Sequence, residues 1–288
     1  MDGTSKKQNV PALDVSSYSK LPILNGFYET VFDFFKMTVP ARISEGRQML
    51  DIGCGDGHVT REVLLPRSLP SRRLVATDVS SDMVGFARAN FPHPKISYDL
   101  LDVSDSGDVK RFIDTYGRFE RVYSVCCLNW VPDQTSAFGN IASLMTNDGD
   151  CVLLYPAVGI VRRIWQRLAA THRWSRFTDV FASFTTRSFQ LTDDESLMAY
   201  VRDLLEEAGL YASTCELLRF DWLDTAPLNQ LAQYAVSISP VHDKLTEEEK
   251  VLLQEDVERE MSTLSTMRTM SKADMTFYVI RATRRRKN

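Results

Sequence analysis

The stretch that most constrains the fold is Met49–Gly57. A short apolar run ends in the acid Asp51, and in the turn that follows glycine occupies every second position, at Gly53, Gly55 and Gly57. Glycine permits backbone angles that other residues avoid, and its missing Cβ lets a ligand approach the main chain. The helical segment that follows offers free N–H groups to polar or anionic ligand atoms. The stretch therefore predicts the first strand–turn–helix unit of a doubly wound α/β sheet, with a ligand at the turn.

Apolar strand-like runs alternate with helical patterns along the rest of the chain, which predicts a parallel sheet. A turn at 147–149 is expected to precede the fifth run. The expected strands cover about 48–51, 74–78, 96–103 (including the exit loop), 121–128, 151–156, 211–222 and 275–282. The helices between them cover 58–65, 82–90, 109–116, 135–145 and 193–208.

The segments outside this alternation predict a cap on a single α/β domain, 43–288. Residues 1–15 are polar and are expected to be flexible. In 16–42 apolar residues recur with helical spacing, which predicts an N-terminal cap helix. Two connections, near 157–190 and 223–270, are longer than a simple crossover needs. We expect them to form a helical lid over the carboxyl ends of the strands, where ligands bind in such sheets.

Composition excludes several classes of protein. The net charge of −4 disfavours a nucleic-acid partner. No apolar run approaches the length of a membrane span or has the form of a signal peptide. The five cysteines form no C-x-x-C pair and have no histidine at metal-ligand spacing, which predicts no metal site and a reducing, cytoplasmic setting. A monomer and a homodimer are both compatible with the sequence.

The spacing Asp-x-Gly-x-Gly-x-Gly differs from the G-x-G-x-x-G fingerprint of dinucleotide-binding enzymes. It resembles motif I of the class I S-adenosylmethionine-dependent methyltransferases. The resemblance implies a seven-stranded Rossmann-like sheet with an antiparallel last strand. It also implies S-adenosyl-L-methionine as cofactor, S-adenosyl-L-homocysteine as product and no metal. In that family the turn, here Gly53, Cys54, Gly55 and Gly57, passes under the methionine part of the cofactor.

Acids at the ends of the first three strands are the main cofactor candidates. Asp51 is expected to order the glycine turn and the cofactor's amino group, or alternatively to cap a helix. Asp78 closes the second strand, where an acid accepts both ribose hydroxyls in nucleoside-binding sheets. Asp102 matches the acid that accepts from the adenine amino group, and Asp99 is its competitor. The remaining candidates for this site are Val79, Met83, Val103 and Cys126, of which Met83 is expected to pack on adenine or in the core.

The end of the fourth strand points to the substrate. The segment Leu128–Val131 is close to the Leu-His-Trp-Val form of small-molecule carboxyl methyltransferases, and lacks the Asn/Asp-Pro-Pro-Tyr form of amino methylases. Trp130 offers a large apolar wall and one N–H donor, which suits a carboxylate on an apolar chain, although a core aromatic is the alternative. Asn129 stands where the related motif has histidine, and is expected to donate to cofactor or substrate.

Together with motif I, these features are similar to those of the arthropod juvenile hormone acid methyltransferases, which methylate farnesoic acid or its epoxide. In that family a Tyr-Ser-Lys segment is followed by a glutamine that holds the substrate carboxylate. Here Tyr18-Ser19-Lys20 is present, and Asn25 stands at the place of the glutamine. Asn25, Asn129 and Trp130 are therefore the predicted substrate-positioning residues.

The predicted reaction is methylation of the carboxylate of a small hydrophobic acid by direct SN2 displacement. A carboxylate is already ionised at neutral pH, so no residue is nominated as a catalytic acid or base. Two alternatives stay open. One is a methyltransferase for another small molecule, such as an amine, a phenol or a polar acid. The other is a non-catalytic protein that binds the cofactor.

Overall fold

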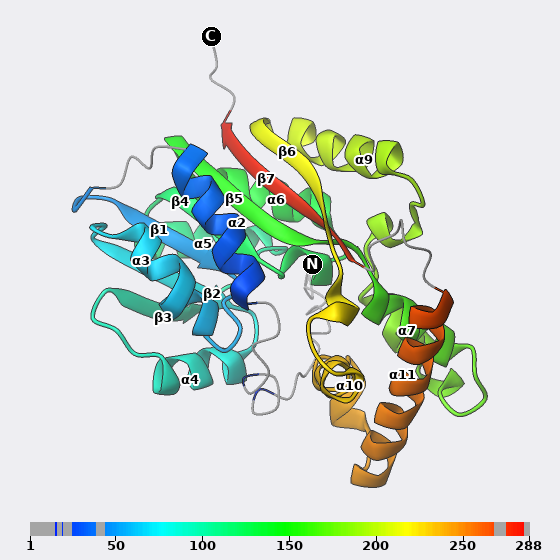
Figure 1. The fold of residues 1–288 in the computed structure, drawn as a ribbon. Helices are drawn as coiled ribbons and strands as arrows, with labels where there is room; N and C mark the ends of the chain where they lie inside the picture. The colour runs from blue at the N-terminus through cyan, green and yellow to red at the C-terminus, as the bar shows by residue number, and fades with distance from the viewer. Residues whose placement is uncertain (1–14, 16–18, 20–24, 39–43, 268–274, 285–288) are drawn as a thin grey trace, which may run out of the picture.

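The structure of the chain is a computed structural model that describes Val15, Ser19 and residues 25–38, 44–267 and 275–284. Its centre is a seven-stranded sheet in the order β3-β2-β1-β4-β5-β7-β6 (Figure 1). The first five strands are parallel where they pair, and β7 runs antiparallel to both β5 and β6. The strands are β1 Gln48–Ile52, β2 Arg73–Asp78, β3 Ile96–Leu100, β4 Phe119–Val125, β5 Met145–Gly159, β6 Leu210–Phe220 and β7 Met275–Arg284. The predicted doubly wound seven-stranded sheet is confirmed.

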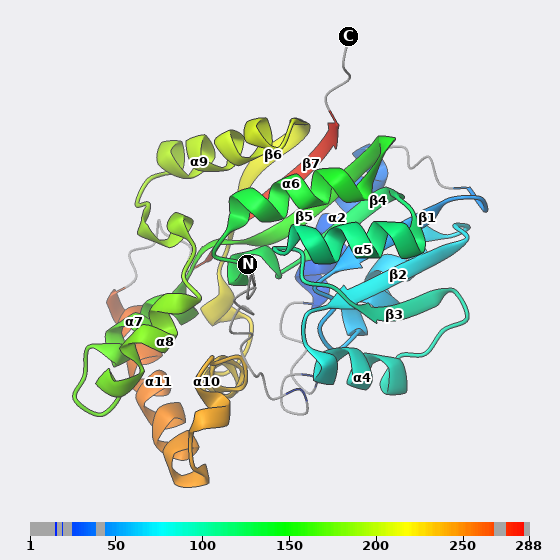
Figure 2. The same ribbon diagram turned by 180° about the vertical axis from the view of Figure 1, so that it is seen from behind.

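Helices cover both faces of the sheet because successive strand side chains point to opposite sides. In β1, Met49 joins one hydrophobic core and Leu50 joins the other. Figures 1 and 2 show the two covering layers. The first layer contains α2 (Asn25–Thr38), a π-helical turn (Val59–Leu64), α3 (Leu65–Ser68) and α4 (Ser81–Asn90). The second contains α5 (Ser106–Tyr116), α6 (Gln134–Leu144) and α9 (Asp194–Glu207).

Side-chain caps set the starts of the helices that follow the strands. A cap accepts hydrogen bonds from backbone N–H groups that have no partner inside the helix. Ser80 accepts from the Met83 N–H at the start of α4, at 3.4 Å. Asp105, Asp133 and Asp193 cap α5, α6 and α9 in the same way. These caps hold each helix start next to the end of the preceding strand.

A further group of helices lies at one end of the sheet: α7 (Ile160–Ala169), α8 (Thr178–Ser183), α10 (Leu228–Ser237) and α11 (Glu247–Met267) (Figure 1). The two long connections, near 157–190 and 223–270, contact each other here. The buried indole N–H of Trp174 in the first donates to Asp256 of α11 in the second, at 2.9 Å. Arg173 pairs with the same carboxylate at 2.8 Å. In the part of the chain that the structure describes, no helix is both long and apolar enough to cross a lipid bilayer.

Several observed elements differ in their bounds from the predicted ones. The first helical segment continues past Pro66 to Ser68, because a proline in the first turn of α3 loses no helical hydrogen bond. The fourth strand ends at Val125 rather than at residue 128, since Leu128–Trp130 forms a 3₁₀ turn.

The fifth strand begins at Met145 and includes the predicted turn at 147–149. That turn survives as a bulge: the pairing with β4 moves from Phe119 opposite Met145 to Arg121 opposite Asp150. Such an irregularity depends on the partner strand, which a local pattern does not reveal.

The predicted N-terminal segments fall largely outside the described residues. Of 1–15 only Val15 is described, and of the cap helix expected over 16–42 the described part is Ser19 and α2. Helix α2 packs on the sheet through Phe27, whose ring lies 4.5 Å from that of Phe220 and 4.8 Å from that of Phe277. The division into cap, core and lid stays a prediction.

A buried ion cluster joins three adjacent strands. Asp150 of β5 accepts two hydrogen bonds from Arg121 of β4, at 2.6 and 2.7 Å. It also accepts from Arg281 of β7, at 2.9 and 3.1 Å. One carboxylate therefore compensates two guanidinium groups at the point where the sheet changes from parallel to antiparallel pairing.

We expect Asp150→Asn to lower the free energy of unfolding by on the order of 2–4 kcal/mol, because it leaves two poorly hydrated cations without a countercharge. Urea unfolding followed by circular dichroism measures the change. Asp194→Asn is the matched control: it breaks an exposed pair with Arg219, whose side chains are 55% and 51% exposed, and should lose less than about 1 kcal/mol. Equal losses in the two variants would show that the cluster has no special role.

Candidate functional site

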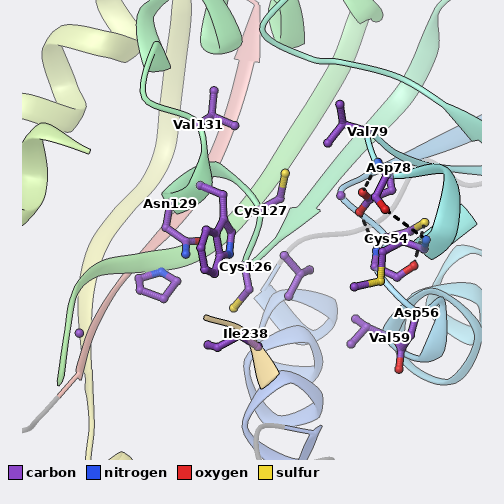
Figure 3. A pocket seen from close by; sticks show the side chains of 18 of the residues that line it. Cys54, Asp56, Val59, Asp78, Val79, Cys126, Cys127, Asn129, Val131 and Ile238 are labelled. Carbon is purple, nitrogen blue, oxygen red and sulfur yellow. Dashed lines mark hydrogen bonds between the residues drawn. The ribbon is translucent and has the colours of Figure 1, made fainter. Parts of the chain in front are cut away.

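A cavity of about 210 Å³ lies between the carboxyl ends of the central strands and the helical group. At one end it is lined by the turn after β1 and by the residues after β2 and β3. At the other end it is lined by aromatic and aliphatic side chains of α7, α10 and their neighbours. Figure 3 shows Cys54 and Asp78 on one side, Cys126 and Asn129 on the other, and Ile238 facing them. The cavity therefore has a polar end and an apolar end.

The glycine turn is fixed by backbone hydrogen bonds to β2. The N–H groups of Gly53 and Cys54 both donate to the carbonyl oxygen of Thr77, at 2.7 and 2.8 Å. Gly53 and Gly55 have φ values of +76° and +55°, which favour glycine. A Cβ on Gly53 would overlap the side chain of Cys127, so the turn packs directly against the chain leaving β4.

Gly57 differs from the other two glycines of the motif. It is not among the cavity-lining residues, whereas Gly53, Gly55 and Cys54 are. Its φ is +87°, and a Cβ there would lie 2.7 Å from the Cβ of Ala87 and 3.0 Å from the hydroxyl oxygen of Tyr98. The packing of the turn on α4 and β3 is therefore sufficient to require a glycine here, and a contact of Gly57 with the cofactor stays a prediction.

Asp78 connects the two loops at the polar end. Its Oδ2 accepts the Gly55 N–H at 3.0 Å, and its Oδ1 accepts the Ser80 N–H at 2.9 Å (Figure 3). Burial raises the pKa of this carboxyl, and the backbone hydrogen bonds from Ser80 and Gly55 oppose that shift. A carboxylate has about four lone-pair positions, so it can accept further hydrogen bonds from a ligand.

Asp51 lies deeper in the same end. Its Oδ2 accepts from the hydroxyl of Thr60 at 2.6 Å, in the helical turn that follows the glycines. Burial raises its pKa to about 7, the hydrogen bond from Thr60 opposes the shift, and the nearby charge of Asp78 adds to it. Asp51 therefore contacts the following helical turn through the side chain of Thr60, and this bond is not a cap on a backbone N–H group. Asp51 also lines the cavity.

The structure separates the two acids that compete for the third position. Asp102 lines the cavity, together with Val103. Its Oδ1 accepts from the N–H and the hydroxyl of Ser104, at 2.9 and 2.6 Å. Asp99 is not among the lining residues, and its carboxylate accepts from the hydroxyl of Tyr116 at 2.6 Å. Asp102 therefore lies at the cavity and Asp99 does not, and the contact of Asp102 with adenine stays a prediction.

The other cofactor candidates are also brought together. Val79, Met83 and Cys126 line the cavity, and Met83 is buried as well, so its two predicted environments coincide. Cys126 has a φ of +52°, an uncommon value for a residue with a side chain. Its sulfur lies 3.1 Å from the hydroxyl oxygen of Tyr28, which links the end of β4 to α2. Backbone strain of this kind is frequent at functional sites.

The predicted substrate residues Asn129 and Trp130 lie in the 3₁₀ turn after β4. The amide of Asn129 fits with its nitrogen 3.0 Å from the Cys126 carbonyl oxygen and its oxygen 3.3 Å from Trp130 Nε1. The indole N–H of Trp130 is therefore directed to this amide, and its ring forms part of the cavity wall. Asn25 begins α2, but its side chain lies outside the described part of the structure.

Several lining residues were not singled out from the sequence. The most informative is Arg162, a buried cation in the first turn of α7. Its sequence signal is weak: an arginine one helical turn before Trp165, inside an aromatic and basic segment. Asp56 adds an acid to the polar end, and Trp222 and Tyr234 add aromatic surface to the apolar end. Among residues placed by the structure, no group of three or more His, Cys, Asp or Glu is arranged to hold a metal ion.

Comparison with known proteins agrees with this fold. Residues 50–151, from β1 into β5, match the family described as "Methyltransferase domain". The structure of Haemonchus contortus phosphoethanolamine N-methyltransferase 2, in complex with S-adenosyl-L-methionine, superimposes with a TM-score of 0.55 at 15% identity. The match covers 98% of this chain and 59% of that one. The chain therefore has the predicted Rossmann-like fold, and residues 50–151 are similar to a methyltransferase domain.

Two relatives in sequence carry a more specific name than the domain family does. The chain is 30% identical to juvenile hormone acid O-methyltransferase of Bombyx mori over 57% of its own length, and 31% identical to the Drosophila melanogaster protein of the same name over 60%. These matches span 56% and 59% of the two relatives. The chain thus spans less than two thirds of the length of the two relatives, to which it is similar in sequence.

The raised pKa of Asp51 predicts a pH-dependent stability. Because the folded state binds this proton more tightly than the unfolded state, its contribution to stability is present below about pH 4 and is lost as the pH rises towards 7. We expect Asp51→Asn to be more stable than wild type at pH 7.5, by on the order of 1–4 kcal/mol, and the gain to vanish towards pH 4. Urea unfolding across this range measures it.

Asp148→Asn, at an exposed carboxylate, is the control and should follow wild type at every pH. A stability gain of Asp51→Asn that is the same at pH 4 and pH 7.5 would contradict the assignment, because the difference would then not come from ionisation.

Proposed function

We propose that this protein is an S-adenosylmethionine-dependent O-methyltransferase that converts the carboxylate of a small hydrophobic acid, similar to farnesoic or juvenile hormone acid, into its methyl ester. The observation that carries the proposal is a single cavity with two unlike ends. The end formed by the glycine turn, Asp78 and Asp102 is polar, and the end around Trp130 is aromatic. The names of the relatives, juvenile hormone acid O-methyltransferases, support acid methylation.

The polar end suits a nucleoside joined to an amino acid. Asp78 retains acceptor capacity for ribose hydroxyls beyond its two backbone bonds. Among the described residues, both hydrogen bonds to the Asp102 side chain go to Oδ1, which leaves Oδ2 for an amino group of the base. Asp51 offers a carboxylate to a cationic amino group. When bound, S-adenosylmethionine supplies an activated methyl group on a positively charged sulfur.

The residues of this chain act by binding, orienting and excluding water. A carboxylic acid substrate is ionised at neutral pH, so its oxygen needs no general base. The 3₁₀ turn Leu128–Trp130 forms the wall between the two ends of the cavity. The buried aromatic side chains of the helical group remove water from the apolar end, and positioning two reactants in this way accounts for large rate accelerations. We propose that this helical group is the lid over the site.

Turnover tests the proposal directly. Purified protein with S-adenosylmethionine and farnesoic acid should form the methyl ester and S-adenosylhomocysteine, both measured by mass spectrometry. We expect a cofactor KM between about 1 μM and 1 mM, the usual range for enzymes. Octanoic acid, a hydrophobic amine and a phenol are the comparison substrates. Methylation of the amine or the phenol without that of any acid would contradict carboxyl methylation, and cofactor binding without turnover would indicate a non-catalytic protein.

The two acids near β3 provide a matched test of the cofactor site. Asp102→Asn should weaken S-adenosylhomocysteine binding by about tenfold or more, because a charged hydrogen-bond acceptor contributes about 1.5–3 kcal/mol. Asp99→Asn should bind as wild type does, since Asp99 bonds Tyr116 and lies outside the cavity lining. Titration calorimetry measures both. Weaker binding in Asp99→Asn alone would reverse the assignment.

A further inference from the structure

Helix α7 places two buried polar side chains at the apolar end of the cavity. Arg162 and Trp165 are one helical turn apart, and their exposed fractions are 6% and 2%. Both line the cavity. Polar groups that are buried to this extent normally have partners, so an uncompensated one indicates a missing ligand or a functional role.

Arg162 carries a charge that the described residues do not neutralise. Its guanidinium donates to the carbonyl oxygen of Asn129 at 2.7 Å and to that of Phe184. It also lies over the ring of Trp130, at 4.4 Å from the centroid. Burial lowers its pKa to about 9, so the group remains cationic at neutral pH. No carboxylate of the described residues forms a salt bridge with it, although burying an unpaired charge is costly.

The guanidinium has donors to spare. Arginine offers five N–H donors in a planar fork that matches a carboxylate, and the carbonyl oxygens of Asn129 and Phe184 use two of its nitrogens. Next to it, the indole nitrogen of Trp165 is buried and has no hydrogen-bond acceptor among the residues that the structure describes. The first turn of α7 follows Gly159, which also lines the cavity, and the start of a helix favours negative charge.

The distribution of charge across the cavity restricts what this end can bind. Four acids line the opposite end: Asp51, Asp56, Asp78 and Asp102. They would repel an anion there and attract a cation. The surroundings of Arg162 are instead aromatic, with the ring of Phe189 centred 5.0 Å from the guanidinium carbon. This environment suits one anionic head group on an apolar body.

We propose that Arg162, assisted by the N–H of Trp165, binds the carboxylate of the acid substrate and selects acids over neutral molecules of the same shape. The inference rests on the proposed function and deepens it by naming the groups that hold the reacting carboxylate. The role thus falls to a residue of α7, in addition to the residues predicted from the sequence, which are Asn25 and the pair Asn129 and Trp130 of the 3₁₀ turn. Arg162 is thus a substrate-positioning residue that also determines specificity.

The test compares binding of farnesoic acid with that of farnesol, its neutral alcohol, to protein saturated with S-adenosylhomocysteine. Wild type should bind the acid at least about tenfold more tightly than the alcohol. Arg162→Met should lose about ten- to a hundredfold in affinity for the acid and less than about threefold for the alcohol. Arg162→Lys, which keeps the charge, should recover part of the selectivity. Calorimetry gives the affinities.

Two further variants sharpen the result. Arg163→Met changes the adjacent arginine, which is exposed and should leave both affinities unchanged. Trp165→Phe removes one N–H donor with little change of apolar surface, and should lower affinity for the acid alone. Thermal unfolding of every variant identifies any loss of fold, and Arg162→Lys and Trp165→Phe keep the test informative if Arg162→Met is unstable.

Equal losses for acid and alcohol in Arg162→Met would overturn the proposal, because a purely structural arginine would affect both ligands alike. Equal affinities of wild type for the two ligands would overturn it as well. The proposed function fails separately: acid selectivity that depends on Arg162, without ester formation, would keep the inference and reject the methyltransferase activity. If Arg162→Met formed the ester with the wild-type kcat/KM, the methyltransferase activity would stand and the role of Arg162 would be rejected.

Discussion

One oxygen of the Asp78 carboxylate accepts the N–H of Gly55, and the other accepts the N–H of Ser80. A single side chain therefore fixes both the turn after β1 and the start of α4 after β2. The carbonyl oxygen of Thr77 adds two more bonds to the same turn. Because β1 and β2 are parallel neighbours, their ends meet at one edge of the sheet, and these bonds make that edge a rigid cradle. The chain leaving β4 can then pack against Gly53 without a gap.

The negative and positive side chains of the cavity lie at opposite ends. Buried carboxylates gather at the cradle, and the guanidinium of Arg162 lies beyond the ring of Trp130. Neither set neutralises the other, although each is expensive to bury in low dielectric. The folded protein therefore holds opposite charges apart, which destabilises it when empty and favours a pair of ligands that bring the matching charges. The ion cluster around Asp150 and the caps of the helices offset part of this cost elsewhere in the fold.

The predictions that the structure confirms were based on residues close together in the sequence. The central strands and helices follow from alternating patterns and from a glycine turn whose backbone angles few other residues adopt. Asp102, which was preferred to Asp99, lines the cavity, and its role in binding the cofactor stays a prediction. Features that depend on partners distant in sequence were not predictable in this way. The bulge at 147–149 exists only in register with β4. The burial of Arg162 requires the 3₁₀ turn near Asn129 and the carbonyl of Phe184 to meet α7. The close packing of Gly57 against Ala87 depends likewise on a distant partner.

The uncompensated guanidinium of Arg162 has a consequence for release of the product. If this protein methylates a carboxylate that Arg162 binds, as we propose, the reaction turns an anion into a neutral ester and removes the charge that this side chain recognises. The ester keeps only the apolar contacts, and the buried cation again lacks a counterion. The empty site is then better satisfied by the next anionic molecule than by the product it has just made. Exchange of product for substrate would then require no movement of α7.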